Sequence, residues 1–233
     1  MAEDKSGEAD TKEKNQPLII TNRKVPAVVD ILSSYAISLT ASKNGMGGPR
    51  KAEDGKEEKV NKKKVELYTN AVMLNNNEIR DLKGLYETLN VSVLYNINYL
   101  QWINLSYNYL VTLDPEIKQF KNLKSLQLHG NYINDLEEVK KLGELEFLFE
   151  LTLNGNPIEE IPGYRLYVLA LMYQKNENLR KLDTVIVTDQ EFDSVLVWKG
   201  FKKGTFDRIK TLKINNLKKR PPPKEVEENN ASK

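Results

Sequence analysis

One eleven-residue pattern occurs three times between Leu100 and Ile158, and it constrains the fold of this chain more than any other feature. The copies occupy residues 100–110, 123–133 and 148–158, and a weaker copy at 69–79 has Thr69 in place of the first leucine. Tandem L-x-x-L-x-L-x-x-N-x-L units are the signature of leucine-rich repeats, which stack into a curved solenoid. The sequence therefore predicts an α/β fold: a solenoid with short parallel strands on the concave face, a helical or 3-10 convex face, capped ends and disordered tails.

The spacing inside each repeat predicts which side chains are buried. Alternation within x-L-x-L-x sends the leucines of a short strand inward and the intervening residues outward. Burying each leucine contributes roughly 1.5–3 kcal/mol, so a single repeat is not stable alone. The asparagine turns the chain out of the strand, and we expect the four asparagines to form a ladder of amides bonded to adjacent loops: Asn77, Asn108, Asn131 and Asn156.

Composition divides the chain into five segments. We expect residues 1–16 to be disordered, 17–40 to be an N-terminal extension or cap, 41–64 a basic flexible linker, 65–198 the repeat domain with its C-terminal cap, and 199–233 a basic, proline-containing tail. In the extension, Pro26 is a candidate helix start, and an apolar face follows it. That helix would either cover the first repeat or dock onto a partner.

The segment between the first and second repeats is expected to be longer and more helical than the later intervals. The ladder asparagines stand 31 residues apart between the first two repeats, against 23 and 25 for the later intervals. The extra residues carry Leu82, Leu85, Tyr86 and Leu89 at helical spacing, which predicts a longer convex-side helix. After Asn131 the apolar residues recur every three, which favours 3-10 or loosely helical structure.

Catalysis has no support in the sequence. The chain carries a net charge of +2, one histidine (His129) and no cysteine, which excludes disulfides and thiol chemistry. No nucleophile motif accompanies His129, and no phosphate-loop, dinucleotide or zinc pattern is present. No apolar run reaches membrane-spanning length. We therefore expect a soluble intracellular protein that is not an enzyme, with no cofactor, no metal and no membrane contact.

Binding is better supported, because the outward strand positions form rows on a rigid surface. The outward positions begin with Ala71, and the predicted protein-binding residues among them are Met73, Asn75, Trp102, Asn104, Ser106, Ser125, Gln127, His129, Glu150, Thr152 and Asn154. Trp102 is a large indole on an otherwise small and polar face. It is either a binding hot spot or a side chain that packs against the N-terminal segment.

A basic arm follows the repeats. Its predicted contact residues are Lys202, Lys203, Arg208, Lys210, Lys213, Lys218, Lys219 and Arg220. A charge run of this kind is often only solvated. The interleaved apolar residues leave open a second interpretation, an arm that becomes ordered on an acidic partner surface.

The end of the array carries its own signature. Gly163-Tyr164-Arg165-x-Tyr167-Val168 begins a helical stretch, and Leu179 to Asp183 supplies a last strand. This resembles the C-terminal cap of intracellular leucine-rich repeat proteins, in which these residues close the open core.

Several stretches together resemble the leucine-rich repeat-containing protein 51 family, with repeats of the type named after the phosphatase regulator Sds22. The resemblance covers about residues 65–200, and its most discriminating parts are Gly163 to Leu169, Val187-Thr188 and Val197-Trp198. It implies a non-enzymatic protein of motile cilia, a component of the axoneme. Lysine-rich arms would then be drawn to the acidic tails of tubulin or to other axonemal proteins.

Two other functions compete with this hypothesis. One is a cytosolic adaptor that binds a protein phosphatase in the manner of Sds22, which a mostly neutral concave surface disfavours. The other is RNA association through the basic tail, which lacks an aromatic stacking platform. The sequence therefore favours protein partners over nucleic acid.

Overall fold

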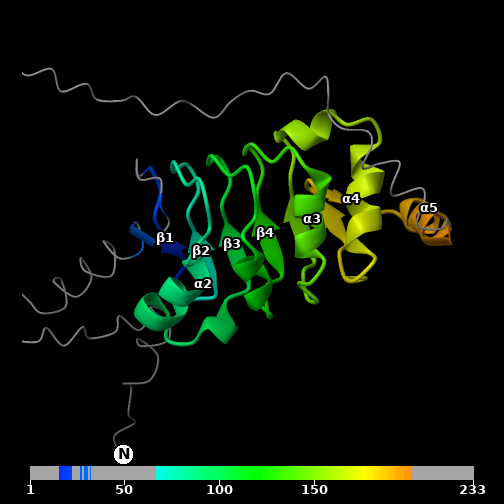
Figure 1. Ribbon diagram of the computed structural model, residues 1–233. Coiled ribbons are helices and arrows are strands. Elements are labelled where there is room, and N and C mark those ends of the chain that lie inside the picture. Colours follow the sequence, from blue (N-terminus) through cyan, green and yellow to red (C-terminus); the bar gives the residue numbers. More distant parts are fainter. Residues whose placement is uncertain (1–15, 23–26, 28, 31, 33–66, 201–233) are drawn as a thin grey trace, which may run out of the picture.

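The computed structural model describes residues 16–22, 27, 29–30, 32 and 67–200 (Figure 1). The predicted linker at 41–64 and the basic arm from Lys202 to Arg220 lie outside these residues. Most of the predicted N-terminal helix lies outside them too, although Val29, Asp30 and Leu32 are helical.

The described strands form one sheet in sequence order. They are β1 (Leu18–Ile19), β2 (Ala71–Met73), β3 (Trp102–Asn104), β4 (Ser125–Gln127), β5 (Glu150–Thr152), β6 (Lys181–Leu182) and β7 (Val185–Ile186). Neighbours from β1 to β6 pair in parallel, and only β7 runs antiparallel to its neighbour β6. This is the predicted solenoid, in which each repeat adds one strand to a continuous concave sheet (Figure 1).

Short helices return the chain along the opposite, convex side. They are α2 (Leu85–Thr88), the π-helix η1 (Leu89–Val93), the 3-10 helices η2 (Ile97–Tyr99), η3 (Pro115–Gln119) and η4 (Pro157–Glu160), and the α-helices α3 (Leu136–Leu142) and α4 (Tyr164–Met172). A further helix, α5 (Asp189–Gly200), follows β7 at the C-terminal end of the array (Figure 1). The longer interval before β3 holds α2 and η1, as its helical spacing predicts. After Asn131, where the three-residue spacing favours 3-10 or loosely helical structure, the chain instead forms an α-helix, α3, with Leu136, Val139 and Leu142 buried. Asp135 caps this helix by accepting a bond from the backbone N–H of Glu137.

The core is a stack of inward side chains from successive strands. Val72, Ile103, Leu126 and Leu151 occupy the same register position in β2 to β5, and each is fully buried. Apolar side chains from the convex helices, such as Val139 and Leu142 of α3, close the stack from the other side. Each buried aliphatic side chain stabilises the array by about 1.5–3 kcal/mol.

The N-terminal extension begins with half a repeat. β1 pairs with β2 in register, and the backbone N–H of Asn22 bonds the carbonyl of Asn76 at 2.9 Å. Asn22 has a positive φ of 59°, like Asn76 at 55°, so the two residues make the same turn out of their strands. Leu18, Ile20 and Leu32 are buried in the common core. These residues cover the open end of β2.

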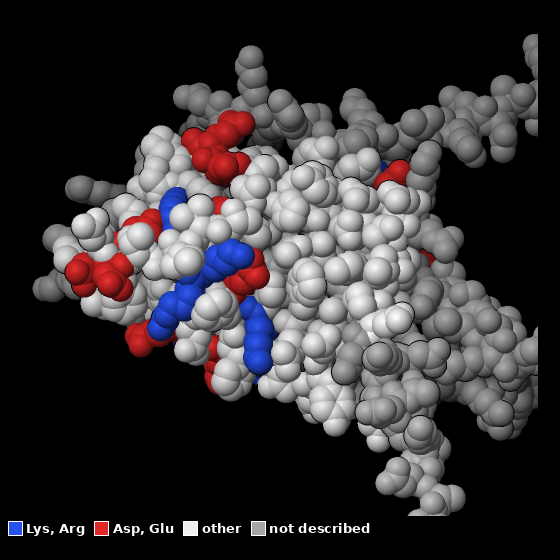
Figure 2. All heavy atoms as spheres, turned by 180° about the vertical axis from the view of Figure 1, so that it is seen from behind, with Lys and Arg blue, Asp and Glu red and all other residues white. Residues whose placement is uncertain are grey.

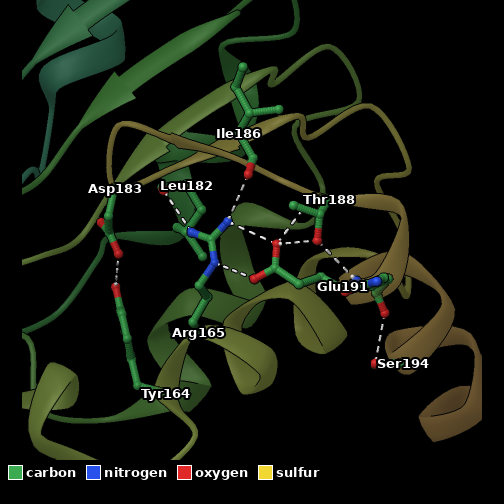
Figure 3. Close-up of polar contacts among 9 residues, drawn as sticks. Tyr164, Arg165, Leu182, Asp183, Ile186, Thr188, Glu191 and Ser194 are labelled. Carbon is green, nitrogen blue, oxygen red and sulfur yellow. Dashed lines mark hydrogen bonds and ion pairs between the residues drawn. The ribbon is translucent and has the colours of Figure 1, made fainter.

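The C-terminal end is closed by a hairpin and two helices. Asp183 and Thr184, both with positive φ, form the two-residue loop between β6 and β7. The Asp183 carboxylate accepts bonds from the backbone N–H groups of Leu153 and Asn154, and its second oxygen accepts one from the Tyr164 hydroxyl at 2.9 Å (Figure 3). Burial and Asp183 raise the pKa of Tyr164, so the phenol stays a neutral donor.

Arg165 ties the remaining parts of this end together. Its guanidinium group donates to both carboxylate oxygens of Glu191 in α5 and to the backbone carbonyls of Leu182 and Ile186 (Figure 3). The hydrogen bond from Arg165 lowers the pKa of Glu191, which also accepts bonds from Thr188. The predicted Tyr, Arg and Leu-Asp elements of the cap therefore converge in one polar network.

Candidate protein-binding surface

The asparagine ladder makes the strand ends rigid. The amide of Asn131 donates to the carbonyls of Leu105 and Leu128 at 3.0 and 2.9 Å, and its oxygen accepts from the N–H of Leu110 at 3.2 Å. Asn108 and Asn156 repeat this pattern one repeat earlier and one repeat later. The predicted ladder is therefore present, and it locks each loop to the next.

Rows of outward side chains cross the concave sheet. One row consists of Ala71, Trp102, Ser125, Glu150 and Lys181, and the next of Ile19, Met73, Asn104, Gln127 and Thr152. The third predicted row, Asn75, Ser106, His129 and Asn154, follows two residues further along the chain. The structure thus assembles the predicted residues on one face and adds Ile19 and Lys181, which the repeat pattern did not include.

Three of the outward positions, including the predicted binding residues Ser106 and Thr152, are not accessible on this face. Ala71, Ser106 and Thr152 are 5%, 2% and 3% exposed. Ser106 turns its hydroxyl onto the side-chain oxygen of Asn104 at 2.7 Å, and the Thr152 hydroxyl shares a 2.8 Å hydrogen bond with Nδ1 of His129. An outward register position does not expose a short side chain when longer neighbours bond across it.

Charge is distributed unevenly along the concave face. Residues 67–77 and 88–113, which contain β2 and β3, include no Asp, Glu, Lys or Arg. At the other end, Lys181 and Glu150 form an ion pair at 2.7 Å, and Asp183 lies in the following loop. Viewed from behind, the surface is white over one half, and its Lys, Arg, Asp and Glu side chains gather over the other (Figure 2). A partner therefore meets a neutral region followed by a charged one.

The neutral region exposes apolar groups. Ile19 is 55% exposed and Trp102 is 36% exposed, and Met73 lies half-buried between their strands. Since β1 covers the open edge of β2, these side chains are held by paired strands. An exposed indole with aliphatic neighbours on a rigid sheet is the composition of a binding hot spot.

His129 belongs to the surface as a neutral group. Burial lowers its pKa, an effect that the negative charge of Asp183 only partly offsets, so the imidazole is uncharged at neutral pH. The ring of Tyr107 packs edge-on against it, with centroids 5.1 Å apart. Within the described residues no cluster of histidine and carboxylate side chains could hold a metal ion.

The described helices are all too short or too polar to cross a lipid bilayer. The concave surface just described is a sheet face that is neutral at β2 and β3 and charged at β5 and β6.

No family model matches the sequence. A comparison with individual proteins does give close relatives. Leucine-rich repeat-containing protein 51 of Bos taurus is 35% identical over 189 residues, which cover 81% of this chain and 88% of that protein. The chain belongs to the leucine-rich repeat-containing protein 51 family. The human member is 32% identical over the same length, and the rat member is 43% identical over 131 residues, 56% of this chain and 66% of its own.

A solved structure supports the fold. The crystal structure of the Drosophila melanogaster SNF/U2A′ complex contains a chain that matches with a TM-score of 0.50 and 23% identity, over 61% of this chain and 75% of that one. The family resemblance and the solenoid fold that the sequence predicts are thus both confirmed. Membership of a leucine-rich repeat family indicates protein–protein interaction.

Proposed function

We propose that this chain is a non-enzymatic structural protein of the ciliary axoneme, which holds a protein partner on its concave face. The neutral, apolar end of that face supports the proposal most strongly. Ile19, Met73 and Trp102 present hydrophobic surface there, with no charged side chain in β2 or β3 to be desolvated. Binding there releases water from apolar surface without burying an unpaired charge.

The charged end of the face sets the orientation of the partner. Glu150 and Lys181 lie in one row with Trp102 and are already paired with each other, so a partner charge at this end gains little net attraction. The apolar contacts at Trp102 then supply most of the binding free energy, and the charged end fixes the position of the partner along the face.

The ciliary location is what the resemblance of the sequence implies, and the basic arm would supply a second contact. Residues 202–220 hold the eight predicted basic side chains from Lys202 to Arg220 against a single acid, Asp207, so they complement the acidic tails of tubulin or acidic axonemal neighbours. Attraction of this kind weakens as salt screens the charges.

The proposal is tested by fractionating cilia that carry the wild-type chain or the Trp102→Ala variant. Detergent followed by stepped salt is applied, and the chain is quantified by mass spectrometry in each fraction. We expect the wild type to resist detergent and to be released only at high salt, and Trp102→Ala to be released at lower salt. Glu137→Ala, on the exposed convex surface of α3, is the matched control and should behave as wild type.

Two results would contradict the proposal. Absence of the wild-type chain from cilia, or its complete release by detergent, would exclude an axonemal part and favour the phosphatase adaptor. Equal retention of Trp102→Ala and wild type would exclude the concave face as the attachment surface.

A further inference from the structure

A second exposed surface lies at the edge of the sheet where the strands begin. It consists of aromatic side chains in the segments that lead into β2, β3 and β5, and we call it the aromatic rim. Its members, each 40–56% exposed, are Tyr68, Tyr95, Tyr99, Phe147 and Phe149. Trp102 is on the concave face and is not part of the rim. So much exposed aromatic surface in one place marks an interaction site.

The repeat register fixes the spacing of the rim. Tyr68, Tyr99 and Phe147 each stand three residues before the first residue of their strand, in the first, second and fourth repeats. The equivalent residue of the third repeat is Asn122, whose amide bonds the carbonyl of Asn98. Tyr99 and Phe147 are therefore two strands apart, which corresponds to about 9.4–9.8 Å.

That spacing matches the pitch of a polyproline II helix. Such a helix has three residues per turn and rises 3.1 Å per residue, so one turn advances about 9.3 Å. A polyproline II segment laid across the strands would place residues of the same face on Tyr99 and on Phe147. The Tyr68–Tyr95 pair, stacked with ring centroids 4.3 Å apart, extends the aromatic surface by one strand.

The polar groups of the rim suit the same ligand. The side-chain amides of Asn70 and Gln101 lie at the rim and make no hydrogen bond within the described part of the chain. A polyproline II backbone has no internal hydrogen bonds, so its carbonyls can accept from these amides. Surfaces lined by aromatic rings are how proline-rich segments are recognised.

The rim is unsuited to two other kinds of peptide. An added β-strand needs free backbone groups, but the carbonyls of Asn70, Gln101, Lys124 and Phe149 each accept two N–H groups from the next strand. A strongly charged peptide needs a surface whose charges all have the sign opposite to its own. The segments that lead into β4 and β5 expose charges of both signs, Lys121 and Lys124 against Glu146, so charge complementarity favours an uncharged ligand.

We propose that the aromatic rim binds a proline-rich segment of a partner protein in the polyproline II conformation. The proposal rests on the match between two lengths: the distance across two strand spacings and the advance of one turn of the ligand. The site is separate from the concave surface around Trp102 and does not depend on the axonemal role.

The proposal is tested by titrating the full chain with a ten-residue polyproline peptide, with a glycine-serine peptide of equal length as the control ligand. NMR spectra of chain labelled at tyrosine and phenylalanine rings report the contact. We expect saturable binding with a Kd below about 1 mM, with ring shifts at Tyr99 and Phe147. The Tyr99→Ala/Phe147→Ala double variant should bind at least about tenfold more weakly.

Two variants serve as controls for this experiment. Tyr107 is 57% exposed, against 56% for Tyr99, but lies at the opposite ends of the strands, so Tyr107→Ala should bind the peptide as wild type does. Trp102→Ala should also retain binding, which separates the rim from the concave face. Thermal melting checks that each variant is folded.

The proposal is overturned if polyproline does not saturate, if the glycine-serine peptide binds equally, or if Tyr107→Ala weakens binding as much as the double variant. A loss of polyproline binding in Trp102→Ala alone would overturn the rim as a separate site, whereas it would leave the concave-face proposal intact.

Discussion

Replacing Asn131 with alanine should destabilise the whole array, and the structure indicates by how much. The amide of Asn131 donates to the carbonyls of Leu105 and Leu128, but Asn108 and Asn156 also donate to these two oxygens, so neither is left without a partner. Among the described residues, the N–H of Leu110 donates only to the Asn131 oxygen. One orphaned buried donor costs about 1–3 kcal/mol, and the lost carbonyl bonds add about 1 kcal/mol, which gives about 2–4 kcal/mol in all.

Urea unfolding followed by circular dichroism measures this change. With a slope of about 2 kcal/mol per molar urea, the midpoint of Asn131→Ala should fall by about 1–2 M. Asn154→Ala is the matched control, because Asn154 is exposed and its side chain makes no hydrogen bond within the described residues. It should change stability by less than about 0.5 kcal/mol. Equal midpoints for the two variants would refute the reasoning, since the ladder would then contribute nothing.

Two further predictions concern the cap and the strand ends. Arg165→Ala should cost about 2 kcal/mol at neutral pH, from its charged bonds to Glu191. Because Arg165 holds the pKa of Glu191 below its ordinary 4.5, this part of the stability exists above that pH and is lost as the pH falls through the lowered pKa. The difference between variant and wild type, measured by urea unfolding from pH 7 to pH 3, should therefore shrink in acid; a constant difference would contradict it. Gly130→Ala should cost about 2 kcal/mol, because its φ is +68° and a Cβ would lie 2.6 Å from the Tyr107 ring. In a Tyr107→Ala background the cost should fall to about 1 kcal/mol in a double-mutant cycle, whereas an unchanged cost would show that the ring does not matter.

The repeat pattern predicted the interior well because burial is periodic. Apolar residues at fixed spacing place Ile103, Leu126 and Leu151 in one register. The asparagine at the ninth position has the same geometric role in every repeat. The C-terminal cap was expected from the resemblance of Gly163 to Val168 and Leu179 to Asp183 to the caps of intracellular leucine-rich repeat proteins.

The pattern missed the half-repeat at the N-terminus, and it did not separate exposed from covered outward positions. Leu18 and Ile20 match the fourth and sixth positions of the repeat, but the ninth position is Arg23 and not asparagine, so the signal was too short to stand out. The burial of Ser106 and Thr152 depends on bonds to Asn104 and His129, which come from neighbouring side chains. Periodicity alone cannot predict such contacts.

The aromatic rim was missed for a different reason. Tyr99 and Phe147 lie outside the strands, at positions that the repeat consensus leaves free, and only the pairing of β3, β4 and β5 sets the distance between them. A search of the variable positions of each repeat, aligned by strand register, would have found them.

Site-specific photocrosslinking inside cilia tests most directly whether the concave face holds the partner. A photoreactive phenylalanine analogue replaces Gln127 in the middle of the concave sheet, or Glu137 on the convex helix α3 as the matched position. After irradiation, the chain is isolated under denaturing conditions and its adducts are identified by mass spectrometry. Our account predicts a discrete protein adduct from position 127, lost in the Trp102→Ala background, and none from position 137. Adducts from position 137 alone, or an adduct at 127 that does not depend on Trp102, would contradict it.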